Sequence, residues 1–325
     1  MTRKGEDFLN ERSRRERRLE RQIARRIEKR HGRRINETLN GGVIRNGRVI
    51  SPDGVDMSHR FEILPVRPES TVRYVRNRSA IEEFSAENGG YVWGLFKSSV
   101  TMEIQWSKHG LTQSDFARLM FIGTYVDYDG VLRHPNGRLI TRESMAELIG
   151  IHRTKFDEFF SKLKAVPIIK VAEDGVIYMS SDVFQRGKIA KGEYVDRIRV
   201  YRDTVRKLYE KYGKGRSVRQ LGIIYSVVPF VHRNLNIVCY NPLEKHEDNI
   251  QPITLDKLAL ILGYQNATKF KAALRAIEIN GQPVFAFVED IHDGRKRRII
   301  VNPRVIFAGN FEGLQACRAL VALFN

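Results

Sequence analysis

Apolar and polar positions follow nearly the same order in two stretches of this chain, ITRESMAELIG at residues 140–150 and ITLDKLALILG at residues 253–263. Both have a threonine, then an acidic residue, a central alanine among aliphatic residues, and a closing glycine. Thr141 and Thr254 are of the type preferred at a helix N-cap, and Gly150 and Gly263 suit the left-handed position that ends a helix. Each stretch therefore predicts a short helix between its threonine and its glycine.

A second amphipathic segment follows each stretch and begins with Thr-Lys-Phe, at residues 154–156 and 268–270. Its apolar residues recur at helical spacing, which predicts one buried face and one polar face. They are Phe156, Phe159, Phe160 and Leu163 in the first segment, and Phe270, Leu274 and Ile277 in the second. An apolar helix also precedes each stretch, at about residues 112–126 and 217–231. Two short helices joined by a glycine turn are typical of a helix-turn-helix.

Both helix-turn-helix patterns are followed by a predicted β-hairpin. Strand-like residues flank an Asp-Gly turn in residues 167–180 and again in residues 283–303, and similar tails follow at 181–187 and 303–309. Three helices and then a hairpin is the order of a winged helix. The sequence thus predicts an α+β chain with two tandem winged-helix domains that arose by duplication.

The rest of the chain predicts shorter elements. Residues 41–50 indicate a hairpin around Asn-Gly, strand-like runs follow at 61–66, 72–75 and 91–96, and residues 311–325 indicate a closing helix with Leu314, Cys317, Leu320, Val321 and Phe324 inward. The predicted divisions are a basic helical arm at 1–40, a β region with the first winged helix at 41–190, a linker helix at 191–216, and the second winged helix with the closing helix at 217–325.

The linker helix has an apolar seam between Tyr194 and Tyr212. Its members are four and three residues apart: Tyr194, Ile198, Tyr201, Val205, Leu208 and Tyr212. This seam predicts either a homodimer contact or packing of the helix on its own domain, and the second is slightly favoured.

Outward residues at the start of each second helix are the candidates for contacts with DNA bases. In the first copy these are His152, Arg153, Thr154 and Lys155; in the second they are Gln265, Asn266, Thr268 and Lys269, followed by Lys271 and Arg275 for phosphates. The amides of Gln265 and Asn266 suit the edge of adenine, whereas Arg153 suits a guanine edge or a phosphate. For each residue, a solvated surface role is the alternative.

The two hairpin tips differ in charge. The second carries four consecutive cations, Arg295, Lys296, Arg297 and Arg298, which suit phosphates or a narrow minor groove. The first carries Glu173 and Asp174, which phosphates repel. The second copy is therefore expected to bind DNA more strongly, while the first uses its helix alone or serves in assembly.

Charge adds to this picture. The chain of 325 residues has a formal net charge of +18, which favours a polyanionic partner, with nucleic acid ahead of an anionic membrane surface. Residues 12–34 contain twelve Lys or Arg and three Glu, among them Arg14, Arg18, Arg21 and Arg25. This arm predicts contacts with phosphates; a solvated tail is the alternative.

Other functional classes have little support in the sequence. Two cysteines cannot form a disulfide framework, and the apolar runs are too short for a signal peptide or a membrane span, so a cytoplasmic, nucleoid-associated protein is expected. There is no P-loop motif, and the histidines do not have metal-ligand spacing. Asp127 and Asp129 favour a turn over a metal site. The sequence thus predicts no enzyme activity, cofactor or metal.

Two segments give the chain a resemblance to a known family. LTQSDFARLMFIGTYVDYDG at residues 111–130 and VIYMSSDVFQRG at 176–187 resemble the winged-helix segment of small plasmid replication proteins from Gram-positive bacteria. More broadly, tandem winged helices resemble plasmid and phage replication initiators. The resemblance implies binding to repeated origin sequences, help in opening the duplex, and recruitment of host helicase or primase. It also implies that one winged helix dimerises while the other contacts DNA bases.

The leading hypothesis is a sequence-specific double-stranded DNA-binding protein that acts as a replication initiator. A phage or plasmid transcription regulator would use the same two DNA-contacting helices and engage the transcription machinery. An interaction subunit would instead dock its winged helices on proteins. An RNA-binding protein would depend on residues 12–34.

Overall fold

The computed structural model describes residues 43–45, 48–60, 79–96, 108–187, 196–289 and 297–309, together with Leu314 and Phe324. Contacts divide the chain into two units, Met1–Arg76 and Asn77–Asn325. In the first unit, β1 (Val43–Arg45) pairs antiparallel with β2 (Arg48–Ile50), and the short 3-10 helix η1 (Ser58–Arg60) follows. This pairing confirms the predicted hairpin. The basic arm at 1–40 and the strand-like runs at 61–66 and 72–75 lie outside the described residues.

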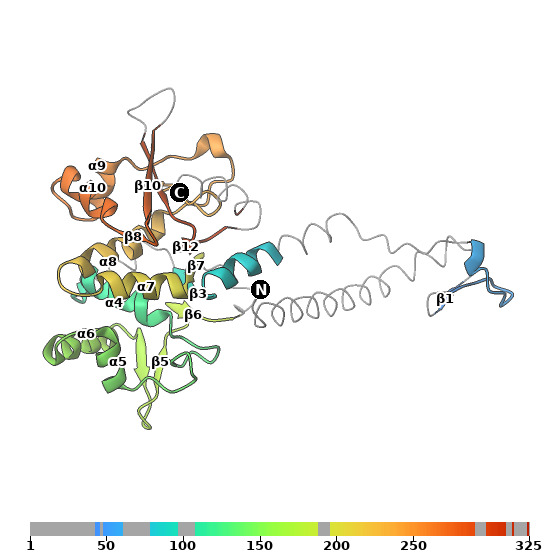
Figure 1. Ribbon diagram of the computed structural model, residues 1–325, viewed down its shortest axis with the longest axis horizontal. Helices are drawn as coiled ribbons and strands as arrows, with labels where there is room; N and C mark the ends of the chain where they lie inside the picture. The colour runs from blue at the N-terminus through green and yellow to red at the C-terminus, as the bar shows by residue number, and fades with distance from the viewer. Residues whose placement is uncertain are drawn as a thin grey trace. The chain divides into compact units, whose positions relative to one another are not determined.

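Within the second unit, residues 112–187 (copy one) follow the predicted order of three helices and a hairpin (Figure 1). The helices are α4 (Gln113–Gly123), α5 (Arg142–Ile149) and α6 (Arg153–Ala165). The strands are β4 (Ile169–Val171), β5 (Ile177–Met179) and β6 (Phe184–Gln185), of which β4 and β5 form the antiparallel hairpin. As predicted, Thr141 caps α5 through its side chain, and Gly150 ends α5 at a φ of 68°.

Residues 217–309 (copy two) repeat this order with additions. The helices are α8 (Ser217–Val227), α9 (Leu255–Ile261) and α10 (Ala267–Arg275), with 3-10 helices η2 (Val228–Phe230) and η3 (Glu247–Asn249) between α8 and α9. A small pair, β8 (Glu278–Ile279) and β9 (Gln282–Pro283), precedes the predicted hairpin of β10 (Phe285–Glu289) and β11 (Arg297–Val301), and β12 (Ile306–Phe307) follows. Thr254 occupies the N-cap of α9 but makes no side-chain cap hydrogen bond.

The apolar faces predicted from helical spacing are buried in a shared core. Phe156, Phe159, Phe160 and Leu163 on α6, and Phe270, Leu274 and Ile277 in copy two, all belong to one cluster of buried side chains. Leu314 and Phe324, the described members of the predicted closing helix, are also buried. None of the helices in the described ranges combines the length and the apolar character that a membrane span requires.

The predicted linker helix is wrong in its first half. Residues 196–201 form β7 (Asp196–Tyr201), and the helix α7 runs only over Arg202–Tyr212. Charged and apolar residues alternate in DRIRVY, and Ile198 and Val200 are buried. An alternation of period two indicates a strand. Ile198 and Tyr201 also fit the helical spacing of the seam, so the sequence pattern was ambiguous here. Because Ile198, Tyr201, Val205 and Leu208 are buried within the unit, this seam packs inside the chain. Tyr194 lies outside the described residues, and the homodimer contact considered above stays a prediction.

A four-stranded sheet joins the two copies in the order β12-β7-β3-β6. The strand β3 (Tyr91–Phe96) follows a helical segment at residues 79–87 and pairs antiparallel with both β6 of copy one and β7. On its other side, β7 pairs with β12 of copy two. Among the described residues, the hairpin β1–β2 forms a two-stranded sheet in the first unit, and β3 belongs to the four-stranded sheet of the second unit. The predicted domain boundaries at residues 190 and 216 both fall inside the second compact unit, Asn77–Asn325.

The helices α4 and α8 cross closely beside this sheet, because Gly222 on α8 faces the backbone of α4. A Cβ at Gly222 would overlap the carbonyl of Gln113, a backbone group that cannot rotate away. Alanine usually stabilises the interior of a helix by about 1 kcal/mol relative to glycine. Here the steric overlap opposes that gain, since overpacking typically costs about 1–3 kcal/mol.

We expect Gly222→Ala to lower the free energy of unfolding by up to about 2 kcal/mol, the net of these two effects, as measured by urea denaturation. Ser226→Ala on the same helix is the control, since the Ser226 hydroxyl is buried without a hydrogen-bond partner among the described residues. It should leave stability unchanged or slightly higher. A stabilised Gly222→Ala variant would contradict this account of the crossing.

Candidate nucleic-acid interface

The start of α6 exposes the residues predicted to contact bases in copy one. His152 occupies the N-cap, and the helix begins at Arg153. All four predicted side chains are exposed: His152, Arg153, Thr154 and Lys155. The opposite face of α6 is held in the core by its phenylalanines and Leu163. The apolar face therefore fixes the orientation of the helix and leaves its polar first turn open to a ligand.

Copy two presents an equivalent surface at the start of α10. Gln265, Asn266, Thr268 and Lys269 are exposed, and Phe270 and Leu274 anchor the opposite face. Further along α10, Lys271 is partly buried and Arg275 is exposed. The Lys271 Nζ and the Arg275 Cζ each lie 5.5 Å from the centroid of the Phe287 ring on β10. These cation–π contacts hold both charges beside the middle of the β10–β11 hairpin.

Asn266 has a structural role that the sequence interpretation did not assign. It is the N-cap of α10, and its Oδ1 accepts a hydrogen bond from the Lys269 backbone N–H at 2.9 Å. The signal was present, because asparagine is among the preferred N-cap residues. With the carbonyl oxygen committed to the cap, the amide cannot offer both of its groups freely to an adenine edge. Gln265 lies before the cap and is exposed, so it becomes the stronger candidate for that contact.

Because Asn266 caps α10 and Gln265 does not, replacement of Asn266 should affect stability, whereas replacement of Gln265 should affect binding. We expect Asn266→Ala to lower the free energy of unfolding by about 1 kcal/mol, whereas Asn266→Ser, which keeps a capping oxygen, should change it by only a few tenths. Gln265→Ala should leave stability unchanged and relax base preference at one or two positions, by about 1–3 kcal/mol for a good contact. Denaturation and binding to a set of single-base variants measure the two effects. An equal loss of affinity on every sequence would mean that Gln265 contacts only the backbone of the duplex.

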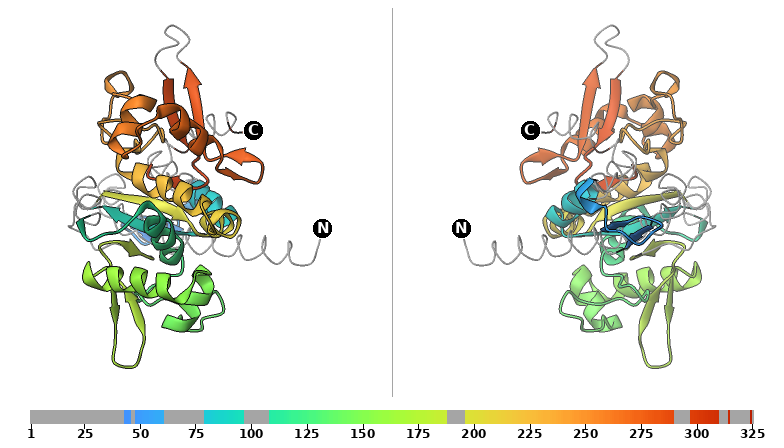
Figure 2. Two further views of the ribbon diagram at one scale, coloured as in Figure 1. Left: turned by 90° about the vertical axis from the view of Figure 1, so that its left-hand side faces the viewer. Right: turned by 90° about the vertical axis from the view of Figure 1, so that its right-hand side faces the viewer.

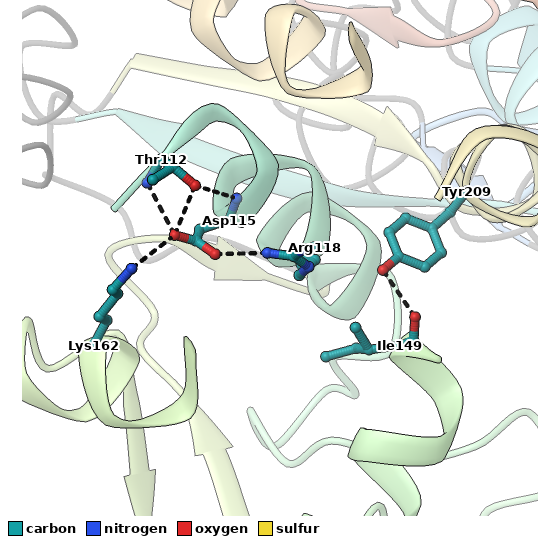
Figure 3. A network of polar contacts seen from close by, with 6 residues as sticks. All are labelled: Thr112, Asp115, Arg118, Ile149, Lys162 and Tyr209. Carbon is teal, nitrogen blue, oxygen red and sulfur yellow. Dashed lines mark hydrogen bonds and ion pairs between the residues drawn. The ribbon is translucent and has the colours of Figure 1, made fainter. Parts of the chain in front are cut away.

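A buried polar network fixes α6 against α4 (Figure 3). Asp115, whose side chain is 5% exposed, forms ion pairs with Arg118 at 2.8 Å and with Lys162 of α6 at 3.3 Å. Its Oδ2 also accepts hydrogen bonds from the Thr112 backbone N–H at 3.0 Å and from the Thr112 hydroxyl at 2.9 Å. One carboxylate therefore caps α4 and docks α6 at the same time.

The C-terminal half of α7 contacts both copies. The Tyr209 hydroxyl donates to the Ile149 carbonyl at the end of α5 over 3.1 Å (Figure 3), and burial raises the pKa of Tyr209 to about 12, so it remains a donor at neutral pH. The Tyr212 hydroxyl accepts from the Glu278 backbone N–H at 3.1 Å, just after α10. The helix α7 thus ties the turn before α6 to the segment after α10.

The pairs α5–α6 and α9–α10 lie on either side of α7 and α8 and are turned toward the same side of the unit (Figures 1 and 2). In copy one, the hairpin tip carries the exposed Glu173 and Asp174, as the sequence indicates. In copy two, Arg295 and Lys296 at the tip lie outside the described residues. The strand β11 begins at Arg297, whose side chain is likewise not described, and Arg298 is exposed beside it. Arg14, Arg18, Arg21 and Arg25 of the arm also lie outside the described residues.

Asp127 and Asp129 belong to a turn, as expected. The Gly130 N–H donates to the Asp127 carbonyl at 3.0 Å, and the Asp129 side chain accepts from the Val131 N–H at 3.0 Å. Their carboxylates pair with arginines: Asp127 with Arg186 at 3.0 Å, and Asp129 with Arg133 at 2.9 Å. In the described ranges, His, Cys, Asp and Glu do not gather into a metal-binding group.

The sequence interpretation also missed a group of arginines around this turn, which lie just after β6, on α7 and in the loop after α4. Arg202 and Arg206 lie one helical turn apart on α7. The predicted linker helix already implied that spacing, but it did not show that Arg186 and Arg133 lie beside them. Comparison of the chain with protein-family models, with curated proteins and with solved structures finds no match.

Proposed function

We propose that the chain is a sequence-specific double-stranded DNA-binding protein whose two copies act as winged helices. One observation carries this proposal: α6 and α10 each combine a buried apolar face with an exposed polar first turn, and a hairpin follows each helix. A helix held in this way can enter a major groove with its N-terminal residues against base edges. The net charge of +18 supports the electrostatic part of such binding.

Copy two is proposed to supply most of the affinity and the base selectivity. Gln265, before the N-cap of α10, and Lys269, in its first turn, are both exposed. Lys271 and Arg275 bring two further cations to the Phe287 ring of the β10–β11 hairpin. In copy one, Glu173 and Asp174 at the hairpin tip repel phosphates, so that its contribution is limited to the first turn of α6.

Two DNA-contacting helices on the same side of one unit favour a bipartite site. Helices that enter successive major grooves on one face of B-DNA are spaced by about one helical turn, roughly 34 Å, or a multiple of it. A site of two short conserved blocks, about one turn or a multiple of a turn apart, is therefore expected. Protection of a single block would limit the base contacts to one copy.

The biological role proposed for this activity is replication initiation, and it rests on the resemblance of residues 111–130 and 176–187 to plasmid replication proteins. A transcription regulator is the alternative with the same DNA-binding surface. Mapping of bound sites decides between them, because an initiator occupies repeats at an origin and a regulator occupies promoters.

Selection of bound duplexes from a random pool, followed by footprinting, tests the proposal most directly. We expect enrichment of a defined motif, and affinity that falls steeply with salt. Recovery of unselected sequences, or preference for single-stranded RNA that is lost on removal of residues 12–34, would reject it.

One observation favours a second candidate, docking onto a protein partner. Leu260 is 71% exposed and Ile261 45% exposed on α9, where copy one has Glu147 and Leu148 at the aligned positions. An outward leucine in place of a glutamate suits a protein contact better than a phosphate backbone. If docking is the main function, the chain should not give a salt-sensitive, sequence-selective DNA complex.

A further inference from the structure

Four arginines surround a cavity of about 280 Å³ in copy one and at the start of α7. They are Arg133, Arg186, Arg202 and Arg206, and two carboxylates, Asp127 and Asp203, also line the cavity. One water occupies roughly 30 Å³ in the liquid, so the space is large enough for a multi-atom anion. The cavity does not include the residues assigned above to base contacts.

The positive charge of this cavity is only partly balanced by its carboxylates. Asp127 is shared between Arg186, at 3.0 Å, and Arg133, at 3.5 Å. Burial, followed by the like charges of Arg206 and Arg186, lowers the pKa of Arg202 to about 10. At neutral pH Arg202 is still a cation, and a bound anion would relieve the repulsion that its neighbours impose.

Capping of α4 explains part of the arrangement. The Thr124 carbonyl accepts from the Arg202 Nε at 2.9 Å and from an Arg206 Nη at 2.8 Å, and the Thr124 hydroxyl accepts from the Arg206 Nε at 3.0 Å. Each guanidinium has more N–H groups than these bonds use. A helix C-cap does not require two arginines at the same carbonyl group, nor a third, Arg186, in the same cavity.

Aromatic rings hold two of the guanidinium groups in fixed planes. The Arg206 Cζ lies 3.9 Å from the centroid of the Tyr125 ring, and the Arg186 Cζ lies 4.4 Å from that of Tyr128. Side chains that are already ordered lose less conformational entropy when a ligand binds. Planar, pre-ordered guanidinium groups are the preferred protein partners of phosphate oxygens.

We propose that this cavity is a binding site for a phosphoryl group, held by Arg186, Arg202 and Arg206. The site is separate from the proposed base contacts on α6 and α10, and its existence does not depend on the proposed DNA-binding function. A phosphoryl group could come from a free phosphorylated molecule or from the backbone of a nucleic acid, and the chemistry of recognition is the same.

Titration calorimetry of the full chain with pyrophosphate at fixed ionic strength tests the site. We expect saturable binding of one pyrophosphate, weakened about tenfold by Arg202→Gln and by Arg186→Gln, as the loss of a charge-assisted hydrogen bond implies. Arg142→Gln is the matched control, because Arg142 also pairs with an aspartate, Asp157, at 2.6 Å, and its loss changes the net charge equally. Its affinity for pyrophosphate should stay within about twofold of the unsubstituted chain.

Absence of saturable binding, or the same affinity in all three variants, would overturn the proposal. Thermal unfolding checks the fold of each variant, and if Arg202→Gln does not fold, Arg186→Gln just after β6 decides the question alone. A duplex-competition experiment then identifies the source of the phosphoryl group. Displacement of DNA by pyrophosphate assigns the site to the nucleic-acid backbone, and unchanged DNA affinity assigns it to a free phosphorylated molecule.

Discussion

Alanine at Arg295, Lys296, Arg297 and Arg298 is expected to weaken binding to every duplex and to flatten its salt dependence. Each phosphate contact contributes about 0.9 to the slope of log K against log salt concentration, so the loss of four contacts would lower the slope by roughly 3 to 4. Affinity at low salt should fall by orders of magnitude, while relative preference among sequences changes little, because contacts with phosphates position the protein without specifying bases. Fluorescence anisotropy over a salt series measures both quantities.

The matched control for this variant is alanine at Arg14, Arg18, Arg21 and Arg25. It removes the same four charges from the arm at residues 1–40, so the two proteins have equal net charge. If the second hairpin holds the duplex, the hairpin variant should lose far more affinity than the arm variant. Equal losses would show that only total charge matters, and a larger loss in the arm variant would transfer the main contacts to the arm.

Much of the fold could be predicted because the chain repeats its pattern. A single run such as ITRESMAELIG is ambiguous, but two copies with the same threonine, glycine and phenylalanine positions constrain each other. The buried faces of α6 and α10, the left-handed Gly150 and Gly263, and both hairpins follow from local periodicity and turn chemistry. These features depend on residues close in sequence.

The four-stranded sheet could not be predicted in the same way, because its strands come from distant parts of the chain. The residues of β7 have helical and strand periods at once, and pairing with β3 and β12 decides in favour of the strand. The burial of the linker seam follows from that pairing. Secondary structure in such a segment is set by tertiary contacts rather than by propensity.

In the candidate site, too, features set by residues close in sequence could be predicted, and features set by distant contacts could not. Exposed positions on α6 and α10 followed directly from the apolar spacing, since the polar side of an anchored helix must face outward. The arginine cavity did not follow, because Arg186 and Arg202 come from different elements and meet only through the sheet. Asn266 lies between these cases: its residue type indicated a cap, but its position before the helix predicted to contact DNA also suited a base contact.

Removal of the Asp115 carboxylate is expected to give the largest loss of stability among the substitutions considered. Arg118 is 12% exposed and would become a buried cation without its ion-pair partner, while Lys162 would lose its anchor on α4. Breaking a buried pair from one side costs about 3–5 kcal/mol, which is a large share of the roughly 5–15 kcal/mol that stabilises a typical domain. Asp115→Ala should therefore lower the free energy of unfolding by about this amount in urea denaturation.

Asp157→Ala provides the control within the same copy, because its Arg142 pair has side chains 51% and 41% exposed and should contribute about 0–1 kcal/mol. The double variant Asp115→Ala, Arg118→Met distinguishes two causes of the lost stability. One is the loss of the ion-pair attraction, and the other is the buried charge that Arg118 keeps without a partner. If the buried cation causes the damage, removing it should recover part of the stability, since an apolar pair of similar volume can replace a buried ion pair at little cost. A double variant less stable than Asp115→Ala alone would show instead that Arg118 stabilises α4 through its packing against the Phe159 ring, 5.9 Å away.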